Sequence, residues 1–190
     1  LDYSGGATCP SLLLEPQRSN LVTFSEYYDA SDWAKSGSPS VTTNSVVSPS
    51  GLHNASTLTS TASSDRIQLT RSAITGSATY SAYVKSNGAY TKLRLRDSGS
   101  GNDARFNVNA DGTITYDTGT NTSYKIEENG NGWYRLSFTF TAAVGTSLVQ
   151  LFPDFTSGGG SAYVWGVQME EGGYPTSYIP TYGSSVTRSV

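Results

Sequence analysis

Residues 133–141, with the sequence WYRLSFTFT, show the most regular pattern in the chain. One side of an extended strand there carries Tyr134, Leu136, Phe138 and Phe140. Because successive side chains of a strand point to opposite faces, this alternation predicts a strand with one buried face. The sequence ENGNG, residues 128–132, precedes it and predicts a turn at the start of the strand.

Short segments of the same character recur from residue 80 onward, with turn-forming residues between them. The expected strands are 80–85, 92–96, 104–108, 113–116, 124–127, 147–152 and 161–169. Alternation places Tyr80, Ala82, Val84, Leu93 and Leu95 on the buried side. Residues 31–35 are expected to form one helical turn capped by Ser31 or Asp32. Many short strands joined by frequent turns predict an all-β fold, a jelly-roll β-sandwich of two antiparallel sheets.

The composition fits a β-rich domain of 190 residues, with 20 Gly, 13 Tyr and only 14% charged residues. The net charge of −3 does not favour a nucleic-acid binder. No apolar run is long enough to cross a bilayer, so no membrane insertion is expected. Cys9 is the single Cys of the chain, which excludes an internal disulfide.

Residue patterns for catalysis and metal binding are weak. His53, the single His, lies in the loop-like sequence GLHNAS without a nucleophile motif beside it. The adjacent pairs Glu127–Glu128 and Glu170–Glu171 point to opposite faces of a strand and so cannot flank one sugar bond. We therefore expect no enzyme and no cofactor. A structural Ca²⁺ is a minor alternative, with loop carboxylates as candidate ligands: Asp97, Asp103, Asp111 and Asp117.

Two terminal segments carry a family resemblance. CPSLLLEPQRSNLV at 9–22 and YVWGVQMEEGGYPTSYIPTYGSSVTR at 163–188 resemble a paired signature of bacteriophage tail-fibre and virion proteins. YSAYVKSNG at 80–88 and NGNGWYRLSFTFT at 129–141 fit the same family, so the resemblance covers nearly the whole chain. Conservative departures stand at Ser19, where the family more often has Thr, and at Val167 and Met169.

The resemblance implies a jelly-roll module related in shape to carbohydrate-binding modules. It implies a location in the virion, after synthesis in the host cytoplasm, and a homotrimeric fibre. We expect one domain over 1–190, divided into a linker from an upstream part (1–11), the sandwich (12–182) and a C-terminal tail (183–190).

The resemblance also implies a role for the polar residues of the two signatures. The N-terminal one carries Glu15, Gln17, Arg18 and Asn20, and the C-terminal one carries Trp165, Gln168, Glu170 and Glu171. The two ends of a jelly roll commonly lie side by side, so we expect the first set to pair with the second or with the backbone near Tyr178. Buried polar groups of this kind must be hydrogen-bonded, which favours a structural role over the alternative, ligand binding.

The outward faces of three expected strands supply the candidate ligand-binding residues, which are Tyr83, Lys85, Arg94, Arg96, Trp133 and Arg135, with Lys92 beside them. If these strands share a sheet, one face presents aromatic rings and cations. Sugars stack on aromatic rings, and Arg binds carboxylates with two donors, so this face would suit an acidic polysaccharide. Contact with solvent or with another subunit is the alternative, because interfaces are also rich in Tyr, Trp and Arg.

These expectations define three functional hypotheses. The first is a non-catalytic receptor-binding module of a phage tail fibre that recognises a bacterial capsule or lipopolysaccharide. The second is a purely structural or trimerisation module of the fibre. The third is a carbohydrate-binding module of a bacterial polysaccharide-degrading enzyme.

Overall fold

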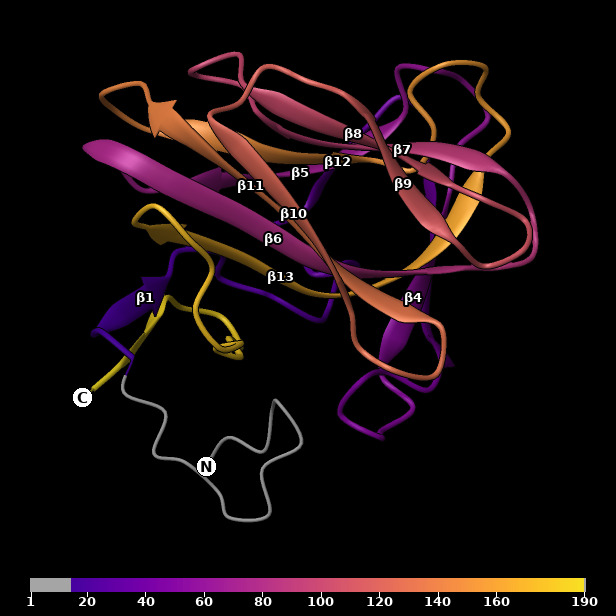
Figure 1. Cartoon of the computed structure of the whole chain (residues 1–190), viewed down its shortest axis with the longest axis horizontal. Helices are drawn as coiled ribbons and strands as arrows, with labels where there is room; N and C mark the ends of the chain where they lie inside the picture. Colours follow the sequence, from indigo (N-terminus) through magenta and orange to yellow (C-terminus); the bar gives the residue numbers. More distant parts are fainter. Residues whose placement is uncertain (1–14, 190) are drawn as a thin grey trace.

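The computed structural model describes residues 15–189, and its regular structure is β throughout that range (Figure 1). The strands are β1 (Arg18–Asn20), β2 (Ala34–Ser36), β3 (Ser40–Val46), β4 (Ala55–Thr59), β5 (Arg66–Arg71), β6 (Gly76–Ser86), β7 (Thr91–Asp97), β8 (Asp103–Val108), β9 (Ile114–Thr118), β10 (Ser123–Glu128), β11 (Trp133–Ala142), β12 (Ser147–Phe152), β13 (Ser161–Glu171) and β14 (Val186–Arg188). No helix of this range is long and apolar enough to span a membrane.

The strands form two layers of six strands each, and β1 and β14 form a small separate ribbon. The first sheet has the order β10-β11-β6-β13-β4-β3, and the second has the order β2-β5-β12-β7-β8-β9. Antiparallel pairs nest inside one another: β4 with β13, β5 with β12 and β6 with β11. A long hairpin rolled into two layers produces this nesting, which is the jelly-roll topology. The predicted fold class is confirmed.

The core lies between the two layers. The predicted inward residues of β6, β7 and β11 are buried there, including Tyr80, Leu93 and Phe138. They pack with inward residues of the other strands, such as Ile67, Phe106 and Leu151, in one hydrophobic cluster. The alternation read from the sequence therefore identifies the correct buried face in each of these strands.

The expected helical turn at 31–35 is wrong. The backbone N–H of Ala30 donates to Tyr27 O, and that of Trp33 donates to Ala30 O, so the segment turns twice and then enters β2 at Ala34. Trp33 is buried: its indole N–H donates to Phe24 O at 2.8 Å, and its ring meets Tyr28 edge-on. Burial of this indole fixes the segment more strongly than a single helical hydrogen bond does.

The two ends of the described chain lie side by side, with β1 next to the C-terminal segment in Figure 1. Ser19 pairs with Thr187 in the antiparallel β1–β14 ribbon, so part of the expected tail forms a strand. The expected linker, residues 1–11, lies outside the described residues, as does Cys9.

Asn20 ties β1 to the rest of the molecule. Its buried side-chain amide donates to Val167 O at 3.2 Å and to Ile179 O at 2.9 Å. Its carbonyl oxygen accepts from the backbone N–H groups of Val22 at 3.1 Å and Met169 at 3.2 Å. All four hydrogen-bonding positions of the amide are used, and each partner is a backbone group that would otherwise be unpaired.

A second part of the network is built on the fully buried Glu170. Its carboxylate accepts from the Thr176 backbone N–H at 3.0 Å, from the Thr176 hydroxyl at 2.7 Å and from Gln168 Nε2 at 2.7 Å. Arg18 Nε lies 3.9 Å from it. The Gln168 oxygen accepts from Ile179 N–H at 2.8 Å. These contacts hold residues 176–179 against the outer side of β13.

Glu15 extends the contact between the two ends. It accepts from Ser177 N–H at 2.8 Å and pairs with Arg188 at 2.7 Å. Gln17 differs from the other polar residues of the N-terminal signature, because it is exposed and its side chain makes no hydrogen bond within the described residues; only its backbone carbonyl accepts one, from Arg18. Glu171 is exposed as well. The structure therefore brings together Glu15, Arg18 and Asn20 with Gln168 and Glu170, and leaves Gln17 and Glu171 at the surface.

Replacing Asn20 tests this network. Asn20→Ala removes four hydrogen bonds and leaves buried backbone groups unpaired, so we expect the free energy of unfolding to fall by about 3 kcal/mol. Ser19→Ala, which removes one partly exposed hydroxyl contact, is the control and should cost less than about 1 kcal/mol. Urea unfolding of the three proteins measures both changes. Equal stability of the two variants would show that Asn20 is not the anchor.

Candidate functional site

The outer side of the first sheet carries a second, smaller apolar cluster. Trp133 is 1% exposed, and its indole N–H donates to Val47 O at 3.1 Å from the segment that follows β3. Tyr83 is 8% exposed and packs against Trp165 at 5.2 Å and Tyr178 at 6.1 Å between ring centroids. Burial raises the pKa of Tyr83 above its usual value. These rings stabilise the fold and offer no open surface for a sugar.

Two cations of the same sheet, Arg135 and Lys85, are also engaged by neighbouring residues of the fold. Arg135 is 9% exposed, donates through Nη2 to the Ser81 hydroxyl at 3.1 Å and lies 5.4 Å over the Tyr83 ring. Lys85 donates to Asn131 O at 2.8 Å. Residue 166 of β13 lies against the Tyr83 ring and has to be a glycine. A Cβ on Gly166, whose φ is +61°, would be 2.9 Å from that ring.

The expectation of one common face is wrong. Tyr83, Lys85, Trp133 and Arg135 lie on β6 and β11 of the first sheet, whereas Arg94 and Arg96 lie on β7 of the second. The chain crosses from the first layer to the second between β6 and β7, so these two strands are neighbours in sequence but not in a sheet. The predicted site is thereby divided between two sides of the molecule.

The outer side of the second sheet presents a cation-rich surface, which we call the arginine face. It consists of Arg66, Gln68, Lys92, Arg94, Arg96, Arg105, Gln150 and Phe152, whose side chains alternate with the core residues of β5, β7, β8 and β12. Five of the 12 Lys and Arg residues of the chain gather here, although the whole chain has a net charge of −3. The alternation that predicted the other outward residues also marks Arg66 and Arg105 as outward. These two residues were nevertheless missing from the candidate site predicted from the sequence.

Asp103 fixes two of these arginines. Both Arg94 and Arg105 donate to its Oδ2 through Nε, the second at 2.8 Å, and Thr120 N–H donates to Oδ1 at 2.9 Å. Burial of Asp103 opposes ionisation, but the Thr120 hydrogen bond and the two guanidinium groups outweigh it and hold the pKa below its usual value. Within the described residues, the hydrogen bonds of Arg94 and Arg105 use Nε alone, so both Nη groups of each remain available.

Phe152 holds two arginines in place by stacking. The guanidinium carbon of Arg66 lies 5.5 Å from its ring centroid, and that of Arg94 lies 5.3 Å away. Phe152 is therefore only 5% exposed. Arg105 stands 4.9 Å over Phe155 in the same manner. Phe152 positions two cations and is itself covered, whereas Phe155 is only partly buried.

Arg96 has no carboxylate partner among the described residues. It lies opposite Gln150 on β12 and opposite Asp103 on β8, but its Nε is buried without a hydrogen bond. Gln150 donates to Gln68 at 2.9 Å, and its own oxygen has no partner in residues 15–189. Two carboxylates, Asp103 and Asp117, accompany the five cations, so the face keeps an excess of positive charge.

The carboxylates considered as calcium ligands lie apart. Asp97 is fully buried and pairs with Arg71 at 2.7 Å, Asp111 accepts from Thr113 N–H at 2.9 Å, and Asp117 lies 3.4 Å from Lys92. Within residues 15–189 no three His, Cys, Asp or Glu side chains form a group that would hold a metal ion. His53 is exposed in the bend before β4.

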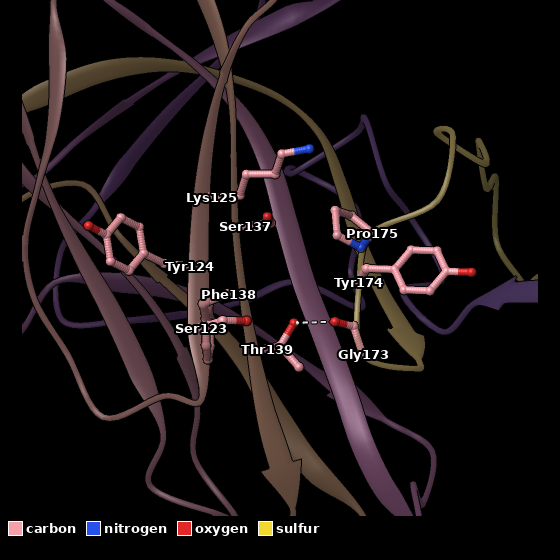
Figure 2. Close-up of a pocket in the computed structure, with 9 residues that line it drawn as sticks. All are labelled: Ser123, Tyr124, Lys125, Ser137, Phe138, Thr139, Gly173, Tyr174 and Pro175. Atoms are coloured by element: carbon pink, nitrogen blue, oxygen red, sulfur yellow. Dashed lines mark hydrogen bonds between the residues drawn. The ribbon is translucent and has the colours of Figure 1, made fainter.

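A groove of about 140 Å³ lies on the outer side of the first sheet, between β10, β11 and residues 173–175 (Figure 2). Figure 2 shows the rings of Tyr124 and Tyr174 directed to opposite sides, away from the groove. Tyr124 stacks on Tyr116 at 3.7 Å, and Arg18 lies 5.8 Å from the Tyr174 ring. With its rings engaged elsewhere and Lys125 as its cation, the groove is a weaker candidate than the arginine face.

Comparisons with known proteins give fold-level likenesses. The chain matches no protein-family model and no curated protein sequence. It is similar to the enzymatically active domain of tailspike protein 4 from bacteriophage CBA120, with 13% identity and a TM-score of 0.44 over 79% of this chain. The match spans 21% of the tailspike chain. It is also similar to the mannan-recognising carbohydrate-binding module TmCBM27, with 16% identity and a TM-score of 0.37 over 83% of this chain and 96% of that one.

The pKa of Asp103 predicts a pH dependence of stability. A carboxylate whose pKa is lower in the folded than in the unfolded chain stabilises fully above about pH 4 and loses this effect as the pH falls through the folded value. Asp103→Asn should therefore lower the free energy of unfolding by about 2 kcal/mol at neutral pH, and the gap to wild type should shrink below about pH 3. Denaturant unfolding at the two pH values measures it.

Asp117 forms an ion pair with Lys92 in which both side chains are partly exposed. Asp117→Asn is therefore the matched control and should lower the free energy of unfolding by less than about 1 kcal/mol. A gap for Asp103→Asn that stays constant across this pH range would contradict the assigned role of the ionised carboxylate.

Proposed function

We propose that this chain is a non-catalytic module of a bacteriophage tail fibre that binds a bacterial surface polysaccharide through the arginine face. The observation that carries the proposal is the concentration of five cations on one face, with Nη donors left free and no compensating number of carboxylates. The resemblance of the two terminal signatures to virion proteins supports the phage assignment.

The chemistry of the face suits an acidic glycan. A guanidinium donates two parallel hydrogen bonds to a carboxylate or a phosphate, and both groups occur in capsules and lipopolysaccharides. Asp103 and Phe152 hold Arg94 from two sides before any ligand arrives. A donor fixed in advance loses less conformational entropy on binding than a free side chain does.

The proposal includes no catalytic step and no cofactor. Sheet faces bind sugars in shallow contacts, so the affinity of one module is low. A homotrimeric fibre with three linked faces raises the apparent affinity without new contacts. In the virion, several such fibres act together on one cell surface.

The structural alternative keeps a specific observation in its favour. The network around Asn20 and Glu170 closes the module on itself and would serve a spacer equally well. The two functions differ in one result, because a spacer binds no glycan. A carbohydrate-binding module of an enzyme differs from both in what is linked to it, a catalytic domain rather than a fibre.

Affinity electrophoresis separates these functions. The protein is run through gels that contain purified capsular or lipopolysaccharide glycans, some acidic and some neutral. Retardation by an acidic glycan supports the proposal. Unchanged mobility with every glycan, from a folded protein, would move the assignment to the structural module.

Charge removal on the face tests its location. The double variant Arg66→Gln with Arg96→Gln removes two cations that have no carboxylate partner among the described residues. Arg66 also contacts Gln68, Ser64 and Phe152, so we expect a small fall in the melting temperature and a protein that stays folded under the conditions of the binding assay. Loss of two charge-assisted contacts should weaken glycan binding at least about tenfold, since about 1.4 kcal/mol corresponds to a factor of ten.

Lys125→Gln removes one charge from the first sheet and is the matched control, which should bind as wild type does. Undiminished binding by the double variant would place the site elsewhere on the molecule.

A further inference from the structure

Three of the five cations of the arginine face, Arg66, Arg94 and Arg105, follow a row across the strands. Phe152 on β12 lies opposite Arg94 on β7, and Arg94 lies opposite Arg105 on β8. On the other side of Phe152, Arg66 on β5 stacks on the same ring. The row therefore reads Arg66, Phe152, Arg94, Arg105 over four adjacent strands.

The strand spacing sets the distances along this row. Neighbouring strands lie about 4.8 Å apart, so the backbone positions of Arg66 and Arg94 are about 10 Å apart, and those of Arg94 and Arg105 about 5 Å apart. Asp103 draws Arg94 and Arg105 together at one end. At the other end Arg66 has no carboxylate partner among the described residues; it donates through Nε to Gln68 and through Nη1 to Ser64 O, which leaves Nη2 for a ligand. The row thus offers two anion-binding positions, separated by the covered ring of Phe152.

We propose that the ligand is a linear polyanionic glycan that crosses β5, β12, β7 and β8, with one acidic group at Arg94 and Arg105 and another acidic group of the same chain at Arg66. This inference rests on the proposed function, and adds that binding requires repeated negative charge. A neutral glycan lacks the groups that these donors need, and Phe152 offers it no stacking platform, because this ring is 5% exposed and lies under two guanidinium groups.

The same geometry disfavours a single-stranded nucleic acid, which is also a linear polyanion. Proteins that bind single strands stack the bases on exposed aromatic side chains. The ring on this row is covered, so it holds arginines and offers no surface for a base. Recognition through carboxylates along a sugar chain uses only the donors that the face presents.

The experiment uses the full chain and oligogalacturonates of one to eight units, which carry one carboxylate per sugar. Titration calorimetry gives the dissociation constant for each length. We expect affinity to rise at least tenfold from the single sugar to the longest chain, with most of the gain at the length that first reaches both positions. Binding of the longest chain should weaken at least tenfold between low and high salt, because screening acts on exposed charges.

Arg66→Gln removes the isolated position and leaves the Asp103 pair intact. It should reduce the gain with length and leave the affinity for the shortest oligomers unchanged. Lys125→Gln on the other sheet should alter neither. An affinity independent of length, or a length dependence that Arg66→Gln leaves unchanged, overturns the inference.

Two further ligands distinguish a failure of this inference from a failure of the proposed function. If carboxyl-reduced, neutral oligomers bind as well as the acidic ones, glycan binding stands and the polyanion inference falls. If single-stranded DNA of equal charge binds more tightly, the ligand class is wrong. Absence of binding to acidic and neutral glycans alike overturns the proposed function itself, and this inference with it.

Discussion

The four hydrogen bonds of Asn20 are the constraint on which the architecture depends most. A jelly roll brings its first and last segments together. Here backbone pairing joins them only over the short β1–β14 ribbon and through isolated hydrogen bonds, such as Leu21 N–H to Met169 O. The Asn20 amide supplies both donors and both acceptors needed to join β1, β13 and the backbone at Ile179. Glu170 and Gln168 of β13 likewise bind backbone N–H groups of the C-terminal segment, and they are hydrogen-bonded to each other. This is why a short strand near the start of the chain carries several polar side chains: their hydrogen bonds supplement the short backbone pairing of β1 with β14.

The sequence determined which side of each central strand faces the core, because alternation is a local property. It did not determine which strands share a sheet. Trp133 and Arg94 both point outward from their strands, yet they lie on opposite sides of the sandwich, since sheet membership depends on pairings between distant segments. Whether an outward residue is buried also depends on segments that are distant in the sequence. Trp133 is covered by the segment at Val47, and Tyr83 by residues around Tyr178, and neither contact leaves a pattern near the residue itself.

The strands that sequence reasoning missed, β2 to β5, show the other limit of local patterns. β3 and β4 are rich in Ser and Thr and carry few large inward residues, such as Leu58, whereas β5 does alternate, with Ile67 and Leu69 inward, over a length too short to stand out. Pairing with β13 and β12 stabilises them, so their structure comes from the neighbouring strands more than from their own composition. The arginine face depends on one of them, because Arg66 lies on β5, and this explains why the candidate site emerged only from the strand order.

The β1–β14 ribbon also determines how the module responds to mechanical load. Arg18 lies opposite Arg188, so the chain enters and leaves the ribbon at the same end. A force that pulls the two flanks apart acts on the ion pair between Glu15 and Arg188 first and then on one strand pair at a time, as in unzipping. Hydrogen bonds that break one after another withstand a smaller pulling force than hydrogen bonds that are sheared at the same time. The opening then reaches Asn20, whose three bonds to Val167, Met169 and Ile179 cross between segments and must break before β13 and the sandwich bear the load.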